Sequence, residues 1–298
     1  MNRGTSPTGY RQILCPVDFS RHSRAALRYA SALAERSDGQ LTVLFANDPM
    51  LAAGVAAATR DAYRLDAETV TELRRFVYST LGPVGAKAAL KVVIGHPVDQ
   101  IDRIARFLNV DLIVMGTHGL SGPKKWFFGS TTEAVFRRAK VPVLAVPARG
   151  RAYDQKRRSG ENTILAPVDL EGADRAELRQ VTDAAQRLGG NALVFYVVKP
   201  AQVPPWLAGR AGDIERDRVQ RAEKEMRRLV GGSTRVQTRV VVGDPVHQIE
   251  KAAAEEKAAV IVMTLKRYGP LGPRRGSTAY RVVCSNVAAV LALPAPES

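Results

Sequence analysis

Cysteine and long apolar runs are both scarce in this chain of 298 residues. The two cysteines, Cys15 and Cys284, form neither a disulfide framework nor the spacing of a metal site, so we expect two buried thiols. No apolar run approaches the roughly 20 residues of a membrane-spanning helix. The polar N-terminal segment has no hydrophobic region of the kind that directs secretion. We therefore expect a cytoplasmic protein with no membrane partner.

Two common nucleotide-binding motifs are missing as well. Glycine is nowhere followed directly by lysine, which excludes the Walker P-loop. No GxGxxG follows the first apolar run, which excludes the dinucleotide fingerprint. Three of the histidines, His22, His96 and His247, have no spacing typical of metal ligands. We expect no metal site built from protein side chains.

Positive charge, by contrast, is in excess, with a net +15 at pH 7. Such an excess favours anionic partners, among them nucleotides and nucleic acids. It is spread evenly, with +8 on residues 1–150 and +7 on the remainder. Aromatic residues do not interleave with the basic ones, so we expect no nucleic-acid partner. A nucleic-acid binder with strongly salt-dependent retention on DNA stays open as an alternative.

The sequence contains two copies of one repeated unit. Four segments of the first half recur in the same order in the second half, namely 13–20 in 164–171, 92–101 in 240–249, 111–116 in 259–264 and 128–147 in 275–294. The offset changes only from 151 to 147 along the chain. A conserved order with small gaps indicates a duplicated domain. We predict one domain at 1–150 and a second at 160–298, joined near 149–160.

Within each copy, short apolar runs alternate with longer amphipathic ones. In the first copy, the predicted strands are QILCPV, LTVLFA, ALKVVIG, DLIVMG and VPVLAVP. The predicted helices are Ser20–Arg36, Asp61–Tyr78, Pro97–Leu108 and Thr131–Ala139. Runs that are apolar throughout suit strands covered on both faces, and the alternation indicates βαβ units. We predict an α/β fold with two doubly wound, five-stranded parallel-sheet domains of Rossmann-like type.

A long loop, GTHGLSGPKKWFFGS, lies between the fourth strand and the fourth helix. Ligands of such sheets bind beyond the carboxyl ends of the strands, where this loop begins. Gly116 and Gly119 permit a close backbone approach, and Gly129 and Ser130 open a helix whose free N–H groups favour an anion. The pattern therefore favours a phosphorylated ligand. The alternative is a mobile surface loop whose glycines and serines only form turns and caps.

The spacing G-x2-G-x9-G-S resembles the ATP-binding signature of the universal stress protein family. Gly116, Gly119, Gly129 and Ser130 fill every specified position. Further blocks resemble that family too, among them PVDFSRHSRAALRYASALA, GHPVDQI and RRAKVPVLAVP. The resemblance covers essentially the whole chain as a tandem pair. It implies ATP binding, with Mg²⁺ as a companion, and a role in stress response through nucleotide occupancy.

Carried over residue by residue, the resemblance implies one set of ATP-binding residues in the first copy. Asp18 would take the adenosine role and Ala46 would lie against the base. The full set is Pro16, Val17, Asp18, Ala46, Met115, Gly116, His118, Gly119, Gly129, Ser130, Thr131 and Thr132.

The second copy departs from this pattern. Its loop reads MTLKRYGPLGPRRGST, with Thr264 in place of the first glycine and Arg267 in place of the second. A side chain at position 267 occupies space that the phosphates need. We therefore predict that the first copy binds one ATP and that the second copy is retained for structure. The four basic residues in the loop of the second copy leave anion binding there open.

No convincing catalytic set emerges from the sequence. His118 lacks a partner placed by sequence, and Lys124 and Lys125 are expected to be solvated. Trp126-Phe127-Phe128 fits packing better than base stacking. We predict a nucleotide-dependent regulator without fast catalysis. A slow ATP hydrolase or an adenylyl-transferring enzyme on the same fold is the alternative.

Each copy ends in an apolar strand, VPVLAVP or AAVLALP. As the last strand of its sheet, each is an exposed edge unless something covers it. The family resemblance implies pairing through this closing strand. We predict an intramolecular pseudo-dimer of the two copies, and a homodimer of two chains stays open.

Overall fold

The computed structural model describes residues 9–48, 62–118, 129–148, 162–170, 175–231, 236–265 and 278–294, with side chains of α3 from residue 67 onward. The chain divides into two compact units, Met1–Gln155 and Lys156–Ser298. Each unit is described below by itself.

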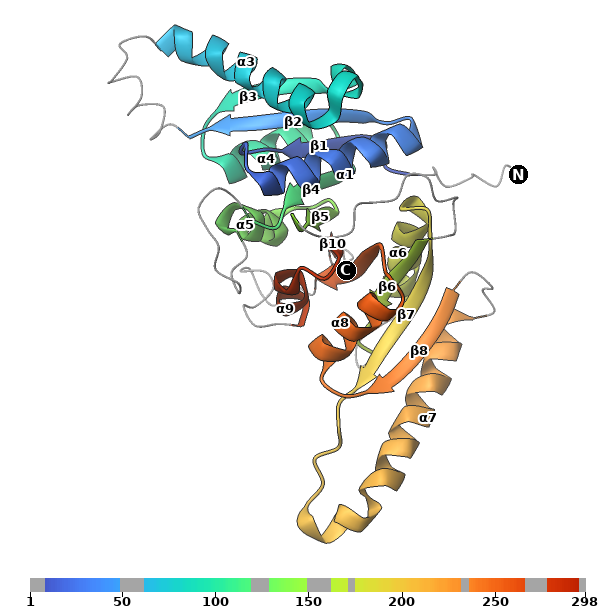
Figure 1. Cartoon of the computed structure of the whole chain (residues 1–298). Coiled ribbons are helices and arrows are strands. Elements are labelled where there is room, and N and C mark those ends of the chain that lie inside the picture. Colours follow the sequence, from blue (N-terminus) through green and yellow to red (C-terminus); the bar gives the residue numbers. More distant parts are fainter. Residues whose placement is uncertain are drawn as a thin grey trace, which may run out of the picture. The chain divides into compact units, whose positions relative to one another are not determined.

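Unit 1 alternates strands with helices along the chain (Figure 1). Its elements are β1 (Gln12–Pro16), α1 (Arg21–Ser37), β2 (Gln40–Asn47), α3 (Ala62–Leu81), the 3₁₀ helix η1 (Gly82–Lys87), β3 (Ala89–Ile94), α4 (Pro97–Phe107), β4 (Leu112–Gly116), α5 (Ser130–Arg138) and β5 (Val143–Val146).

The strand order in unit 1 is β3-β2-β1-β4-β5, and all neighbouring strands are parallel. Strands β1 and β4 are apolar and buried because helices cover a parallel sheet on both faces. The predicted five-stranded α/β fold is therefore confirmed for the first copy. The chain reverses its direction of winding between β1 and β4, so the carboxyl ends of these two strands form the switch point where ligands bind in such folds.

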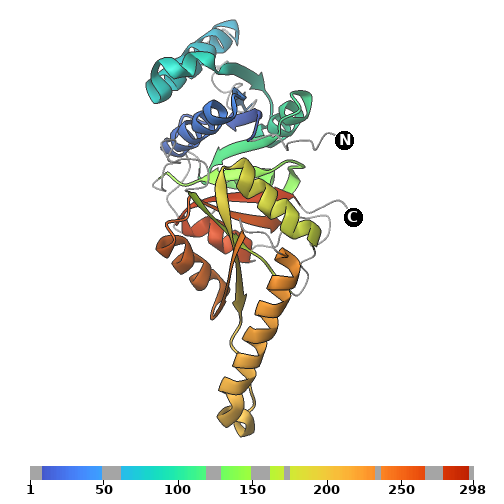
Figure 2. The same ribbon diagram turned by 90° about the vertical axis from the view of Figure 1, so that its right-hand side faces the viewer.

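Unit 2 repeats this architecture with elements of similar order. They are β6 (Asn162–Pro167), α6 (Arg175–Arg187), β7 (Gly190–Val198), the 3₁₀ helix η2 (Pro205–Arg210), α7 (Ala211–Val230), β8 (Val236–Val242), α8 (Pro245–Glu255), β9 (Val260–Leu265), α9 (Thr278–Ser285) and β10 (Ala289–Pro294). The order β8-β7-β6-β9-β10 matches that of unit 1, again with parallel neighbours. Figure 2 shows η2 and the start of α7 extending beyond the ends of β7 and β8.

Local sequence signals set the ends of helix α1. Ser20 is its N-cap, and the side-chain oxygen of Ser20 accepts a hydrogen bond from the N–H of Ser23. Asp38 ends the helix in the left-handed conformation, with φ 49°. Small residues such as Ala26 and Ala30 are fully buried in this helix, which lets it pack closely on the sheet.

The remaining predictions about single elements have mixed outcomes. Helix α3 runs to Leu81, three residues past the predicted end, and continues into η1, where Gly82 takes φ +65°. Cys15 and Cys284 are both buried, and each is a thiol that takes part in no disulfide, as expected. Burial raises the pKa of the Cys15 thiol far above its usual value. Within the described ranges, no helix has the length and apolar character to span a membrane.

Candidate functional site

The predicted ATP-binding residues gather at one edge of the sheet of unit 1. Pro16 ends β1, and Val17 and Asp18 follow it. Ala46 is the last residue but one of β2. Met115 and Gly116 end β4, and the first turn of α5 carries the Ser130-Thr131-Thr132 segment behind its N-cap, Gly129. Carboxyl ends of parallel strands meet at the same edge, so these positions share one side of the unit. Gly119 lies outside the described residues, as do Lys124, Lys125 and Trp126-Phe127-Phe128.

Two hydrogen bonds close the base of the long loop. The hydroxyl of Thr132 donates to the carbonyl oxygen of Gly116 at 2.9 Å, and the N–H of Gly129 donates to the carbonyl oxygen of Thr117 at 3.0 Å. Thr132 and Thr117 are both buried, at 5% and 2% exposure. The residues on either side of the segment 119–128 are therefore fixed to each other, which keeps the start of α5 beside the end of β4.

The first turn of α5 presents free hydrogen-bond donors at this edge. The backbone N–H groups of Ser130, Thr131 and Thr132 donate to no described residue, as expected for the start of a helix. The hydroxyls of Ser130 and Thr131 also have no partner within the described ranges. Ser130 is exposed and Thr131 is half-buried. This arrangement can receive an anion, because the donors and the positive end of the helix dipole coincide.

Gly116 has a packing role that the sequence did not reveal. A Cβ atom at this position would lie 2.8 Å from both the Cβ and the carbonyl carbon of His22. No larger residue fits without a shift of α1 or β4. The sequence prediction explained this glycine by the close approach of a ligand. In the structure, helix α1 also approaches it closely.

The turn after β1 holds Asp18 in a defined position. The Oδ1 atom of Asp18 accepts a hydrogen bond from the N–H of Ser20 at 3.1 Å. Between them, Phe19 adopts φ +62°, a conformation that L-residues with large side chains rarely take. Such strain persists only where the surroundings enforce it and is common at ligand sites.

A pair of histidines lies next to Gly116, and no pattern in the sequence indicates it. The rings of His22 and His118 are 5.2 Å apart between centroids. The Nδ1 atom of His118 lies 3.0 Å from the hydroxyl oxygen of Thr117, whereas the Nδ1 atom of His22 is buried without a hydrogen-bond partner among the residues that the structure describes. Burial lowers the pKa of His22, and the positive charges of His118 and Arg21 lower it further, while Asp18 opposes them. The lowered pKa favours the uncharged form of His22 at neutral pH.

Sequence reasoning also missed an aromatic cluster at the ends of β1 and β2. Phe19 packs against Phe45 at 4.6 Å and against Phe76 at 5.3 Å between ring centroids. Phe19 and Phe45 line a cavity of about 540 Å³ together with Asn47 and residues of α3. Phe45 and Asn47 lie on the opposite face of β2 from Ala46, the residue that the family resemblance assigns to the base, because side chains alternate along a strand.

Unit 2 retains a cavity at its own switch point. The cavity measures about 260 Å³ and lies at the carboxyl ends of β6, β7 and β9. Its lining includes Asp169, which corresponds to Asp18, and Thr264, which replaces Gly116. The hydroxyl oxygen of Thr264 is buried and has no hydrogen-bond partner in the part of the chain described. Position 267, on which the predicted loss of binding depends, lies outside the described residues.

Comparison with known proteins identifies the family. The model of the universal stress protein family matches residues 9–147 and again residues 161–291. The chain belongs to the universal stress protein family. Among the relatives of this universal stress protein, MJ0577 of Methanocaldococcus jannaschii is 29% identical over an alignment of 153 residues that covers 46% of this chain and 94% of MJ0577.

A second relative from the same organism, universal stress protein MJ0531, is 28% identical over 141 residues and covers 46% of this chain and 82% of its own length. Among solved structures, a universal stress protein from Archaeoglobus fulgidus has a TM-score of 0.64 and 22% identity. It covers 95% of this chain and 97% of its own. At that identity the similarity establishes the fold, including its two-unit organisation, and the resemblance stated from the sequence is confirmed at the level of the family.

Proposed function

We propose that this universal stress protein binds one ATP in unit 1 and acts in stress response through nucleotide occupancy. The observation that carries the proposal is the first turn of α5. Three backbone N–H groups and two hydroxyls without partners in the described ranges lie where the family signature G-x2-G-x9-G-S is complete. That donor set fits a chain of phosphates and fits poorly with an apolar or cationic ligand.

The remaining parts of the nucleotide have matching partners in the chain. The carboxylate of Asp18 accepts hydrogen bonds and suits the ribose hydroxyls or the base amine. Ala46, near the end of β2, offers a small side chain against which the base would lie. Ser130 and Thr131 would bind phosphate oxygens, and Thr132 would keep α5 in place through its bond to Gly116.

Bound Mg²⁺ would be held mainly by the phosphates. The described residues contain no group of three or more His, Cys, Asp or Glu side chains that could hold a metal ion. Mg²⁺ commonly binds through substrate phosphates and water with only one or two carboxylates, so a protein cage is not required. The chain itself would orient the nucleotide and complement its negative charge. This supports the interpretation that the protein acts as a regulator.

The direct test is to purify the protein under native conditions, denature it and identify any released nucleotide. The accompanying binding experiment compares Asp18→Ala with Asp169→Ala, its counterpart in unit 2. The first change should weaken ATP binding by roughly 1–3 kcal/mol, because a buried hydrogen bond is lost. The second should leave the affinity unchanged. Equal effects of the two substitutions, or none from either, would contradict a single site built around Asp18.

We further propose that the two units pair through their closing strands. Strand β5 is last in the order of unit 1 and β10 is last in that of unit 2, and both are apolar. Unpaired apolar edges invite association, and the linkage of two copies in one chain raises their effective concentration. Calorimetric unfolding tests this proposal. If unit 1 is destabilised by a substitution, paired units should still unfold in one transition at a lower temperature, whereas independent units should unfold in two.

A further inference from the structure

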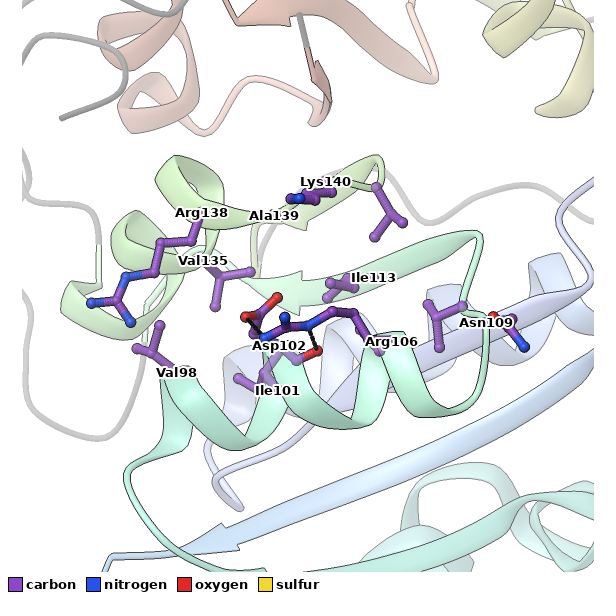
Figure 3. A pocket seen from close by; sticks show the side chains of 13 residues that line it. Val98, Ile101, Asp102, Arg106, Asn109, Ile113, Val135, Arg138, Ala139 and Lys140 are labelled. Atoms are coloured by element: carbon purple, nitrogen blue, oxygen red, sulfur yellow. Dashed lines mark hydrogen bonds and ion pairs between the residues drawn. The ribbon is translucent and has the colours of Figure 1, made fainter. Parts of the chain in front are cut away.

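A groove lies between helices α4 and α5 of unit 1, away from the proposed ATP site. We call it the α4–α5 groove, and its lining consists of Val98, Ile101, Asp102, Ala105, Arg106, Asn109, Val110, Ile113, Val135, Arg138, Ala139, Lys140 and Val141. Figure 3 shows Val98 and Val135 near one end, Asn109 at the other and Ile113 on the strand between the helices.

The interior of the groove is apolar. Eight of its thirteen lining residues are Val, Ile or Ala, and four of these eight belong to α4 or the strand below it. The cavity measures about 350 Å³. Pockets for small molecules span roughly 300–1,000 Å³, so this one suits a short aliphatic or small aromatic body.

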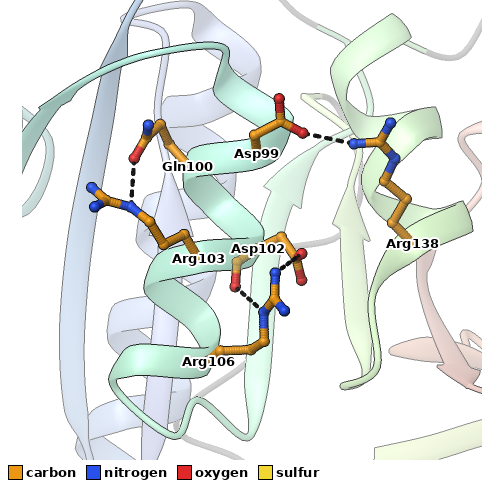
Figure 4. Close-up of polar contacts among 6 residues, drawn as sticks. All are labelled: Asp99, Gln100, Asp102, Arg103, Arg106 and Arg138. Carbon is orange, nitrogen blue, oxygen red and sulfur yellow. Dashed lines mark hydrogen bonds and ion pairs between the residues drawn. The ribbon is translucent and has the colours of Figure 1, made fainter.

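The rim of the groove is basic. Arg106 pairs with Asp102, and Arg138 pairs with Asp99 at 2.7 Å (Figure 4). Both arginines are exposed, at 68% and 61% of their side-chain surface, and such surface pairs contribute little to stability. Lys140 is exposed and forms no hydrogen bond or ion pair with any described residue. Among the described residues, an incoming carboxylate therefore finds Lys140 without an ion-pair partner and two guanidinium groups that can turn toward it at low cost.

The repeat supplies an internal comparison for this rim. At the offsets of the repeat, the apolar residues Val98, Ile101 and Ile113 correspond to Val246, Ile249 and Ile261 of unit 2. The three cations do not recur: the positions of Arg106, Arg138 and Lys140 are held by Ala254, Ser285 and Val287. Packing of two helices on a sheet thus requires the apolar residues in both units, whereas it does not require the cations. At the lining positions, unit 1 thus has three cations, whereas unit 2 has one, Lys257, at the position of Asn109.

We propose that the α4–α5 groove binds a small amphipathic carboxylate. Its aliphatic body lies along the apolar floor, and its carboxylate lies at Lys140 between Arg106 and Arg138. Charge complementarity and the size of the cavity both favour this class. Burial of the methylene groups favours binding, and the charged hydrogen bonds at the rim select an acid over a neutral molecule of the same length.

Decanoate is a suitable probe, with decanol as its uncharged counterpart. Calorimetric titration and amide NMR of the intact chain should show decanoate binding with shifts on α4 and α5, while α8 and α9 stay unchanged. Decanol should bind roughly tenfold more weakly or worse, because its hydroxyl carries no negative charge to pair with the cations of the rim. The triple variant Arg106→Ala, Arg138→Ser, Lys140→Val, which introduces the residues of unit 2, should lose a similar factor.

The matched control is Arg103→Ala. Arg103 is exposed on the same helix, bonds to Gln100 and does not line the groove, so its removal lowers the charge without changing the site (Figure 4). This variant should bind decanoate like the parent chain. All four replaced arginine and lysine side chains are exposed, so melting temperatures should change little. Equal affinity for decanoate and decanol, an unchanged affinity in the triple variant or shifts confined to other helices would overturn the proposal.

Discussion

The hydroxyl of Thr132, on the first turn of α5, donates a hydrogen bond to the carbonyl oxygen of Gly116 at the end of β4. The threonine is buried, so Thr132→Val leaves a buried carbonyl without this donor. We expect the free energy of unfolding to fall by roughly 1–3 kcal/mol. Urea denaturation followed by circular dichroism measures the change, and ATP affinity should fall with it because α5 loses its anchor.

The neighbouring Thr131 provides the control for this prediction. Thr131→Val removes a half-buried hydroxyl that bonds to no described residue. Stability should stay within about 0.5 kcal/mol of the parent chain, while ATP binding weakens. If both threonine variants lose the same stability, the bond between Thr132 and Gly116 does not hold the loop closed.

A second prediction concerns the space around Gly116. In Gly116→Ala, the new methyl group would lie 2.8 Å from the carbonyl carbon of His22, so α1 or β4 must move. We expect a loss of roughly 1–3 kcal/mol in the free energy of unfolding. Gly212→Ala is the control, because nothing lies within 4 Å of its added Cβ. That change should be neutral or stabilising by up to about 1 kcal/mol, since alanine favours a helix over glycine. A loss of equal size in both variants would show that the effect is not steric.

A third prediction concerns acid stability. Burial and the nearby positive charges hold the pKa of His22 below its ordinary value of 6.5. Below 6.5 the unfolded chain takes up a proton at this residue before the folded chain does. The contribution of His22 to the free energy of unfolding should therefore be fully present above pH 6.5. It should decrease as the pH drops from 6.5 toward the lower pKa of the folded state.

Thermal melts between pH 8 and pH 5 test this in the parent chain and in His22→Gln. Glutamine does not titrate, so the variant should lose less stability than the parent over the same range. A parallel decline in both proteins would mean that His22 takes no part in the pH dependence.

The fold followed from the sequence because its signals were local and repeated. Apolar runs such as DLIVM and VPVLAVP predicted strands, and Ser20 predicted the start of α1, which begins at Arg21. The end of α3 was misplaced because no glycine or proline stops that helix before Gly82. The family was also predictable, since its signature depends on spacing along one segment.

The details of the site were less predictable because they join residues far apart in the chain. The contact between His22 and His118 depends on α1 packing on β4, which no local pattern encodes. The packing reason for Gly116 arises from the same contact. Phe19 and Phe45 meet because β1 and β2 are neighbours, and their aromatic cluster emerges only when both strands are placed. Register and helix packing therefore carry the information that the sequence pattern leaves out.

The central claim is that unit 1 alone binds ATP, and calorimetric titration of the intact chain with Mg-ATP tests it most directly. The parent chain should bind one ATP, and Gly119→Arg, which introduces the residue found at this place in unit 2, should bind none while its melting temperature is unchanged. Two equal sites per chain, or unaltered binding in the Gly119→Arg variant, would contradict the account.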